Sequence, residues 1–116
     1  MGTEKEKTTQ QYRLNITENG YATIDEISDY IANEKFEPIS AVNVVDRIFE
    51  AIDKIPLDPF IHSECEEIPT KSKMYRKVLC MSWWIVYRIK KDEVIILGVV
   101  STSRSKSKIR SLRKIK

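Results

Sequence analysis

The sequence predicts an α+β fold with an N-terminal strand, an antiparallel helical hairpin, a three-strand antiparallel sheet and a basic C-terminal tail. Two observations support this prediction. Apolar residues repeat every three or four positions between residues 24 and 55, which is the period of amphipathic helices. Aromatic and β-branched residues then concentrate in three short segments after residue 74, as is typical of strands. With 116 residues, the chain is long enough for one domain.

A polar arm and one strand are predicted at the N-terminus. Residues 1–10 contain alternating Glu and Lys and lack an apolar anchor, so we expect a flexible arm. From Tyr12 to Thr17, apolar and polar residues alternate, as they do in a half-buried strand. The Glu18-Asn19-Gly20 sequence then predicts a break before the first helix.

Two helices are predicted next, joined by a short connection. The first begins near Thr23, with acidic residues that suit a first helical turn, and ends near Phe36. The second lies between Pro38 and Pro56, and its apolar residues form one stripe from Ala41 to Ile55. So short a connection makes the two helices antiparallel.

Three strands are predicted in the second half of the chain, at Tyr75–Cys80, Trp83–Ile89 and Val94–Ser101. A polar turn joins the last two strands into a hairpin. In the middle strand, successive side chains point to opposite faces. We expect the face of Trp83 to cover the helices, and the face of Trp84 and Arg88 to be left open.

The two remaining segments are predicted to lie outside the core. Residues 57–73 contain two prolines and a group of glutamates, and they predict a long surface connection. Residues 104–116 contain seven Lys or Arg and no acid, and apolar residues recur there every three positions, which favours a basic amphipathic helix. We therefore expect a single domain over residues 11–104 and a basic tail over residues 105–116.

Charge is separated along the chain. Residues 1–70 carry 6 Lys and Arg against 15 Asp and Glu, a net charge of −9, whereas residues 71–116 carry 14 against 2, a net charge of +12. A cationic surface of this kind attracts polyanions, and nucleic acid is the first candidate partner.

The motifs that are absent exclude several classes of function. Three glycines cannot form a phosphate-binding loop, and no catalytic triad motif is present. His62 is the only histidine, in a loop where a solvated side chain is expected, and Cys65 and Cys80 lack metal-ligand spacing. We therefore expect neither a metal nor a cofactor. No apolar run resembles a signal peptide or a membrane span, so we expect a cytoplasmic protein with reduced thiols and no membrane contact.

The candidate binding residues lie on or beside the predicted sheet and in the tail. Arg and Lys side chains can bind phosphates, and an indole can stack on bases. Trp84 has a second interpretation, in which it packs against a loop or the C-terminal segment, and the tail has one as a solvated charge run. The candidates are Arg76, Lys77, Trp84, Arg88, Arg104, Lys106, Lys108 and Arg110.

Three segments together resemble a known family. They are the first helix from Ile24 to Ala32, the second helix from Ala41 to Ile52 with the prolines after it, and the strands from Tyr75 to Leu97 leading to Arg104. No single segment is specific, but their order and spacing are similar to those of the RelE/ParE superfamily of toxins from bacterial and archaeal toxin–antitoxin pairs. The resemblance covers the chain from Tyr12 to about Arg104.

The resemblance implies a small growth-inhibiting toxin of a type II, plasmid-stabilisation-like system. Its partner would be a cognate antitoxin whose extended C-terminal segment wraps around it. RelE-like members cut mRNA in the ribosomal A site, whereas ParE-like members poison DNA gyrase without known nuclease chemistry. A ribonuclease of this kind needs a base for the ribose 2′-hydroxyl, cations for the phosphate and a proton donor for the leaving oxygen.

The resemblance also implies roles for individual residues. Lys77 matches a lysine on the first strand of the sheet, a candidate base, and Arg104 matches an arginine that would stabilise phosphate charge. Trp84 and Arg110 stand where RelE-like nucleases carry an arginine and a tyrosine, so the acid–base set is incomplete. Enzymatic activity is therefore left open. These departures favour ParE-like gyrase binding; the alternatives are RelE-like cleavage of mRNA on the ribosome and a non-toxic relic that binds nucleic acid.

Overall fold

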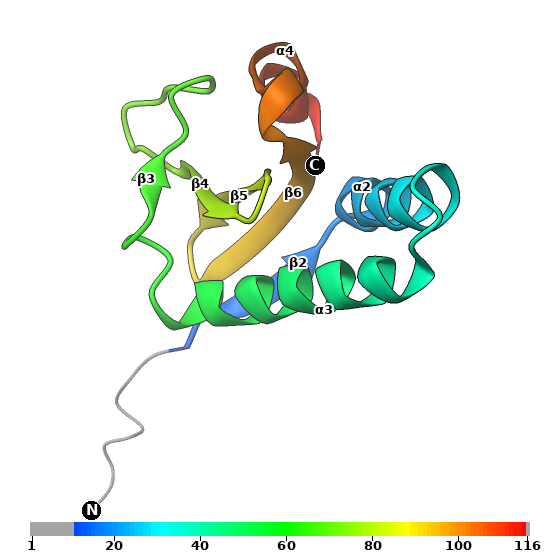
Figure 1. Ribbon diagram of the computed structural model, residues 1–116. Helices are drawn as coiled ribbons and strands as arrows, with labels where there is room; N and C mark the ends of the chain where they lie inside the picture. The colour runs from blue at the N-terminus through cyan, green and yellow to red at the C-terminus, as the bar shows by residue number, and fades with distance from the viewer. Residues whose placement is uncertain (1–10, 116) are drawn as a thin grey trace, which may run out of the picture.

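Among the described residues, the sheet has five strands in the order β2-β6-β5-β4-β3, and helices pack on both of its faces (Figure 1). The computed structural model describes residues 11–115 apart from the side chain of Arg104, so the arm predicted for residues 1–10 lies outside the described residues. The predicted α+β fold is confirmed. In chain order the elements are β2 (Arg13–Ile16), α2 (Glu18–Asp29), η1 (Tyr30–Glu34), α3 (Pro38–Lys54), η2 (Ile55–Leu57), β3 (Ser63–Glu64), β4 (Tyr75–Cys80), β5 (Trp83–Lys90), β6 (Glu93–Ser101), η3 (Thr102–Arg104), α4 (Ser105–Ser111) and η4 (Leu112–Lys114).

The three strands predicted in the second half form the centre of the sheet. β4, β5 and β6 are antiparallel as predicted, with Val86 opposite Lys77 on one side and Gly98 on the other. β2 adds to β6 in parallel, and the two-residue β3 adds to β4. A parallel pair requires a long crossover connection, which the helices provide. The complete sheet is therefore mixed.

α2 begins at Glu18, so the break predicted at Glu18-Asn19-Gly20 is wrong. Thr17 is the N-cap of this helix: its Oγ1 accepts a hydrogen bond from Gly20 N at 2.9 Å and donates one to Ile96 O at 2.7 Å. A Cβ on Gly20 would lie 3.0 Å from Ile96 O, so this glycine permits a close approach of helix and strand. Glu18, Asn19 and Gly20 form the first helical turn because Thr17 and Gly20 contact β6, and the local sequence does not reveal this contact.

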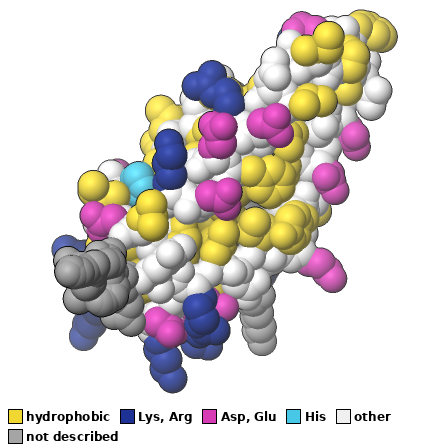
Figure 2. All heavy atoms as spheres, turned by 90° about the horizontal axis from the view of Figure 1, so that it is seen from below, with side chains coloured by type: hydrophobic (Ala, Val, Ile, Leu, Met, Phe, Trp, Pro, Cys, Tyr) yellow, Lys and Arg dark blue, Asp and Glu magenta, His cyan; other side chains and the backbone are white. Residues whose placement is uncertain are grey.

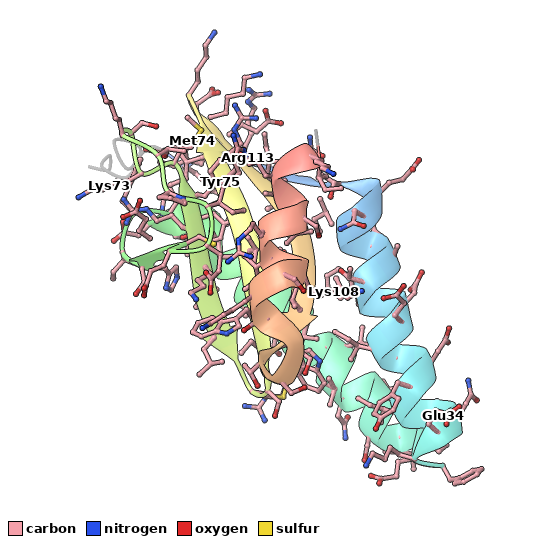
Figure 3. The ribbon with its side chains drawn as sticks, turned by 90° about the horizontal axis from the view of Figure 1, so that it is seen from above. Glu34, Lys73, Met74, Tyr75, Lys108 and Arg113 are labelled. Carbon is pink, nitrogen blue, oxygen red and sulfur yellow. The ribbon has the colours of Figure 1, made fainter. Side chains whose placement is uncertain are left out.

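α2 and α3 form the predicted hairpin on one face of the sheet (Figures 1 and 3). α3 begins at Pro38 as predicted, and its residues Ala41, Ile48 and Ile52 are buried. α2 ends in the π-helical turn η1, after which Phe36 has a φ of 57°. Seen from below, this side of the molecule carries both hydrophobic and acidic side chains (Figure 2).

The second face of the sheet is also covered, so the prediction of an open face is wrong. Ile109 of α4 and Leu112 of η4 are buried in a cluster that includes Val86 and Leu97. Gly98 makes room for this contact, because a Cβ there would lie 3.0 Å from Leu112 Cδ2. The three-residue spacing of apolar residues favoured a helix at this position, but it did not indicate which surface the helix would cover.

The connection over residues 57–73 is less exposed than predicted. Cys65 and Ile68 are buried in the same cluster as Val86, and β3 lies within the connection and pairs with β4. Glu67 lies between these two buried residues, and the connection therefore brings a carboxylate to the second face of the sheet.

Candidate functional site

Lys77 and Trp84 lie side by side on the second face of the sheet. They come from the adjacent strands β4 and β5, and Lys77 Nζ is 4.2 Å from the centre of the Trp84 ring. Glu67 completes the group, with Lys77 Nζ 3.1 Å from its Oε1 and 3.2 Å from its Oε2. The side chains of Lys77 and Glu67 are only 11% and 13% exposed. We call these three residues the Lys77 cluster.

The Lys77 ammonium contacts both the Glu67 carboxylate and the face of the Trp84 ring. Burial alone would raise the pKa of Glu67, but its own backbone amide, the Lys77 ammonium and the Cys65 thiol together outweigh burial and lower that pKa. The carboxylate is therefore ionised at neutral pH and occupied by Lys77. A general base must present a free lone pair, which an ion-paired ammonium does not.

The Cys65 thiol beside the cluster is not a nucleophile. It donates a weak hydrogen bond to Glu67 Oε1 at 3.5 Å. Burial, followed by the negative charge of Glu67, raises the pKa of Cys65 to about 11. A thiol with such a pKa stays protonated and unreactive at neutral pH.

Arg76 serves to brace the connection before β4. Its guanidinium donates hydrogen bonds to the backbone carbonyls of Phe60, His62 and Lys73, at 3.2, 2.9 and 2.9 Å. The guanidinium carbon also lies 5.1 Å from the centre of the Phe60 ring. Because side chains alternate along a strand, Arg76 lies on the face opposite to Lys77. Because its guanidinium is bonded to three backbone carbonyls, Arg76 links β4 to the connection before it.

His62 and Tyr87 also lie away from the Lys77 cluster. Their rings meet edge to face with centres 6.3 Å apart, and the Tyr87 hydroxyl donates to the Pro59 carbonyl. Burial raises the pKa of Tyr87 and lowers that of His62. His62 is thus half-buried rather than freely solvated as predicted. Neither ring faces the side of the sheet where the candidate base lies.

Arg88 lines a separate cavity near the other end of β5. Its Nε donates to Met74 Sδ at 3.3 Å, and its guanidinium carbon is 5.9 Å from the centre of the Tyr75 ring. The cavity has a volume of about 300 Å³, and Lys90 and Lys91 also line it. Arg88 is four positions along the strand from Trp84, a distance of roughly 13 Å. The two residues therefore do not form one small site.

The cations of the C-terminal segment are exposed. Lys106, Lys108 and Arg110 project from α4 into solvent. Lys108 and Glu26 also line a groove of about 400 Å³ between α2 and the end of β6. Figure 3 labels Lys108 between α4 and α2. The backbone of Arg104 lies in η3, directly after β6, but its side chain is outside the described part of the structure.

Of the predicted site residues with described side chains, the structure brings Lys77 and Trp84 into direct contact. Trp84 is partly buried against the second-face cluster, in agreement with the interpretation that it packs against a loop or the C-terminal segment. Sequence reasoning missed Glu67. The group of glutamates directly before the basic strands was a signal for an ion pair, but nothing in its spacing indicated which glutamate would face Lys77.

The arrangement suits binding better than acid–base chemistry. The exposed cations of α4 can attract an anionic partner, whereas the charge of Lys77 is paired with that of Glu67, and His62 and Tyr87 lie away from this pair. Within residues 11–115, no group of three or more His, Cys, Asp or Glu side chains is placed to hold a metal ion. Among the described helices, none is both long and apolar enough to cross a membrane.

Comparisons with known proteins agree with the fold. The model of a family described as the ParE toxin of the type II toxin–antitoxin system parDE matches residues 15–106. The chromosomal ParDE toxin–antitoxin system of P. aeruginosa contains a chain similar to this one, with a TM-score of 0.63, 20% identity, and coverage of 79% of this chain and 97% of that chain. A mutant of the E. coli toxin RelE in the free state is similar with a TM-score of 0.57, 13% identity, and coverage of 91% and 99%. No curated protein sequence matches the chain significantly.

The family match begins in β2 and ends within α4. It therefore includes β3 to β6, the Lys77 cluster and the backbone of η3. It therefore covers well over half of the chain, and the two similar structures share its α+β architecture. The chain belongs to the ParE toxin family of type II toxin–antitoxin systems, within the RelE/ParE superfamily.

Proposed function

We propose that this toxin inhibits growth by binding DNA gyrase, and that it does not cleave RNA. The observation that supports this proposal is the state of Lys77. Its ammonium contacts both oxygens of Glu67 and lies over the Trp84 ring, in a position that is only 11% exposed. The residue that would have to accept the ribose proton is thus engaged with a carboxylate.

The remaining requirements of a ribonuclease are also poorly supplied. A leaving oxygen needs a proton donor near the attacked phosphate. Tyr87 lies on the face covered by α2 and α3, with its hydroxyl bound to the Pro59 carbonyl, and Arg110 on α4 stands at the position where the resemblance implies a tyrosine. Cations alone attract a phosphate, but they do not move the protons of the cleavage reaction.

A cognate antitoxin is the proposed partner that neutralises the toxin. The similar P. aeruginosa protein is part of a ParDE toxin–antitoxin system. The exposed cations Lys106 and Arg110 on α4 would pair with carboxylates of an antitoxin segment. Because gyrase and the antitoxin are cytoplasmic, we propose that the toxin acts in the cytoplasm.

A gyrase supercoiling assay with the purified protein tests the proposal. We expect loss of supercoiling at an excess of toxin, and weaker inhibition by Arg104→Ala. Lys54→Ala removes an exposed cation from α3 and is the matched control, which should inhibit like the wild type. Full supercoiling in the presence of a toxin that still arrests growth would overturn the gyrase assignment. Normal growth on induction would indicate the non-toxic relic instead.

The variant Lys77→Arg separates binding from catalysis. Arginine keeps the positive charge and the ion pair with Glu67, but it does not release a proton to act as a base at neutral pH. We expect Lys77→Arg to retain toxicity. Loss of toxicity in Lys77→Arg, together with codon-phased cuts in mRNA from cells that express the wild type, would establish the RelE-like ribonuclease.

A further inference from the structure

Four large apolar side chains around the turn between α2 and α3 project into solvent. Phe36 is 84% exposed, Ile39 77%, Val42 59% and Tyr30 52%. We call these four residues the hairpin tip. Figure 2 shows hydrophobic side chains at the upper right end of the molecule, where this turn lies, with acidic side chains around them. Exposed apolar groups that are rimmed by charge mark interaction surfaces.

Backbone hydrogen bonds lie within the turn that carries the hairpin tip. Lys35 N donates to Tyr30 O at 3.2 Å, and Glu37 N donates to Ile31 O at 3.1 Å, so the end of η1 is closed by hydrogen bonds. Phe36 follows with a φ of 57°, a left-handed conformation at which glycine is usual. At this position the chain has a phenylalanine instead, and its ring is exposed to solvent. A surface formed before binding loses little conformational entropy when a partner binds.

Ile39 and Val42 extend the apolar surface along α3. They are three residues apart near the start of the helix and therefore lie on the same side of it. The buried residues Ala41 and Ile48 lie on the side of α3 that packs on the sheet. The apolar side chains of the tip thus add nothing to the core of this chain.

The surroundings of the hairpin tip are acidic. Residues 25–46 contain six Asp or Glu and one Lys, a net charge of −5. This charge repels phosphates, so nucleic acid and anionic lipid are poor occupants of the tip. Lys or Arg side chains beside an apolar stripe would match both the charge and the exposed apolar groups.

Over residues 11–115, a second copy of this chain does not offer such a segment on its surface. Its own basic amphipathic segment is α4, but the apolar residues Ile109 and Leu112 are buried against the sheet of the same chain. We therefore propose that the hairpin tip binds a basic amphipathic helix of a different protein, on a surface separate from the Lys77 cluster and from α4.

Titration of the ¹⁵N-labelled full chain with a synthetic Leu/Lys amphipathic helical peptide tests this proposal. We expect chemical shift changes at the amides of residues 30–42, and no binding of a Leu/Glu peptide of the same length. The double variant Phe36→Ser/Ile39→Ser should weaken binding at least tenfold. Ile61→Ser, which replaces a side chain that is 69% exposed outside the tip, is the matched control and should leave affinity unchanged.

Charge is tested with Glu34→Lys/Asp46→Lys, which should weaken binding of the Leu/Lys peptide, against the control Glu50→Lys/Asp53→Lys further along α3. Equal binding of both peptides, shift changes on α4 instead of the tip, or unchanged affinity in the serine double variant would overturn the proposal. A wild-type dimer in sedimentation that Phe36→Ser/Ile39→Ser converts to a monomer would also overturn it, in favour of a second copy. These measurements do not depend on toxicity, so the gyrase proposal stands or fails separately.

Discussion

Lys77 of β4 and Glu67 of the preceding connection form a bidentate contact, in which one ammonium lies 3.1 and 3.2 Å from the two carboxylate oxygens. They are ten positions apart in the chain, and both side chains are largely buried. The pair fixes the connection over the sheet, because Glu67 lies between the buried residues Cys65 and Ile68. The same contact engages Lys77, the candidate base, with a carboxylate, and it anchors the connection over residues 57–73.

Breaking this pair should destabilise the protein. Glu67→Gln or Lys77→Met alone should each lower the free energy of unfolding by about 2 kcal/mol, because each leaves a buried charge without its partner. The double variant Glu67→Gln/Lys77→Met should be less destabilised than the sum of the two, and the difference is the coupling measured by urea unfolding of all four proteins. Strict additivity would show that the two side chains do not interact in solution.

The ion pair should also make stability depend on pH. The pKa of Glu67 is lower in the folded protein than in the unfolded chain, so its contribution is complete above the unfolded pKa of about 4.3. It is lost as pH falls through the folded pKa. We expect the stability gap between wild type and Glu67→Gln to be constant near neutral pH and to close at acidic pH, as followed by unfolding midpoints. A gap that widens on acidification would contradict the direction of the shift.

Gly20→Ala should destabilise the protein although it replaces a helical glycine. Alanine is favoured over glycine in a helix by about 1 kcal/mol. At Gly20, however, the new Cβ would lie 3.0 Å from both Ile96 O and Ile16 Cγ2, and a backbone oxygen yields little. Asn43→Ala, at an exposed position of α3, is the control and should be neutral or slightly stabilising. Thermal unfolding of both variants decides whether packing or helix propensity dominates.

Local patterns were sufficient for elements that are determined by their own residues. Pro38 marks the start of α3, and the aromatic and β-branched runs gave β4 and β5 with nearly their observed bounds. The start of α2 was misplaced because it depends on a contact across the chain. Thr17 Oγ1 bonds to Ile96 O, 79 residues away, and no local propensity contains that information.

The candidate site was harder to predict for the same reason. Sequence placed Lys77 on the correct strand, but its chemistry is determined by Glu67, which lies in a segment without periodicity. The second face is covered because Leu112 packs against Gly98. The sequence of a short basic helix does not indicate which surface the helix packs on. Charge separation identified the cationic half correctly, but it could not distinguish the braced Arg76 from the exposed Arg110.

The C-terminal segment should detach as a unit when its anchors are shortened. α4 has seven residues, and helices shorter than about 12 residues are marginal in water without packing. Ile109 and Leu112 provide its buried contacts, so Ile109→Ala/Leu112→Ala should release residues 105–115 while the sheet stays folded. Hydrogen exchange should show loss of protection in that segment and retained protection in β5, whereas Lys106→Ala, at an exposed position, should change neither. Uniform loss of protection across the sheet would mean instead that α4 and the core unfold cooperatively, because global unfolding exposes all amides together.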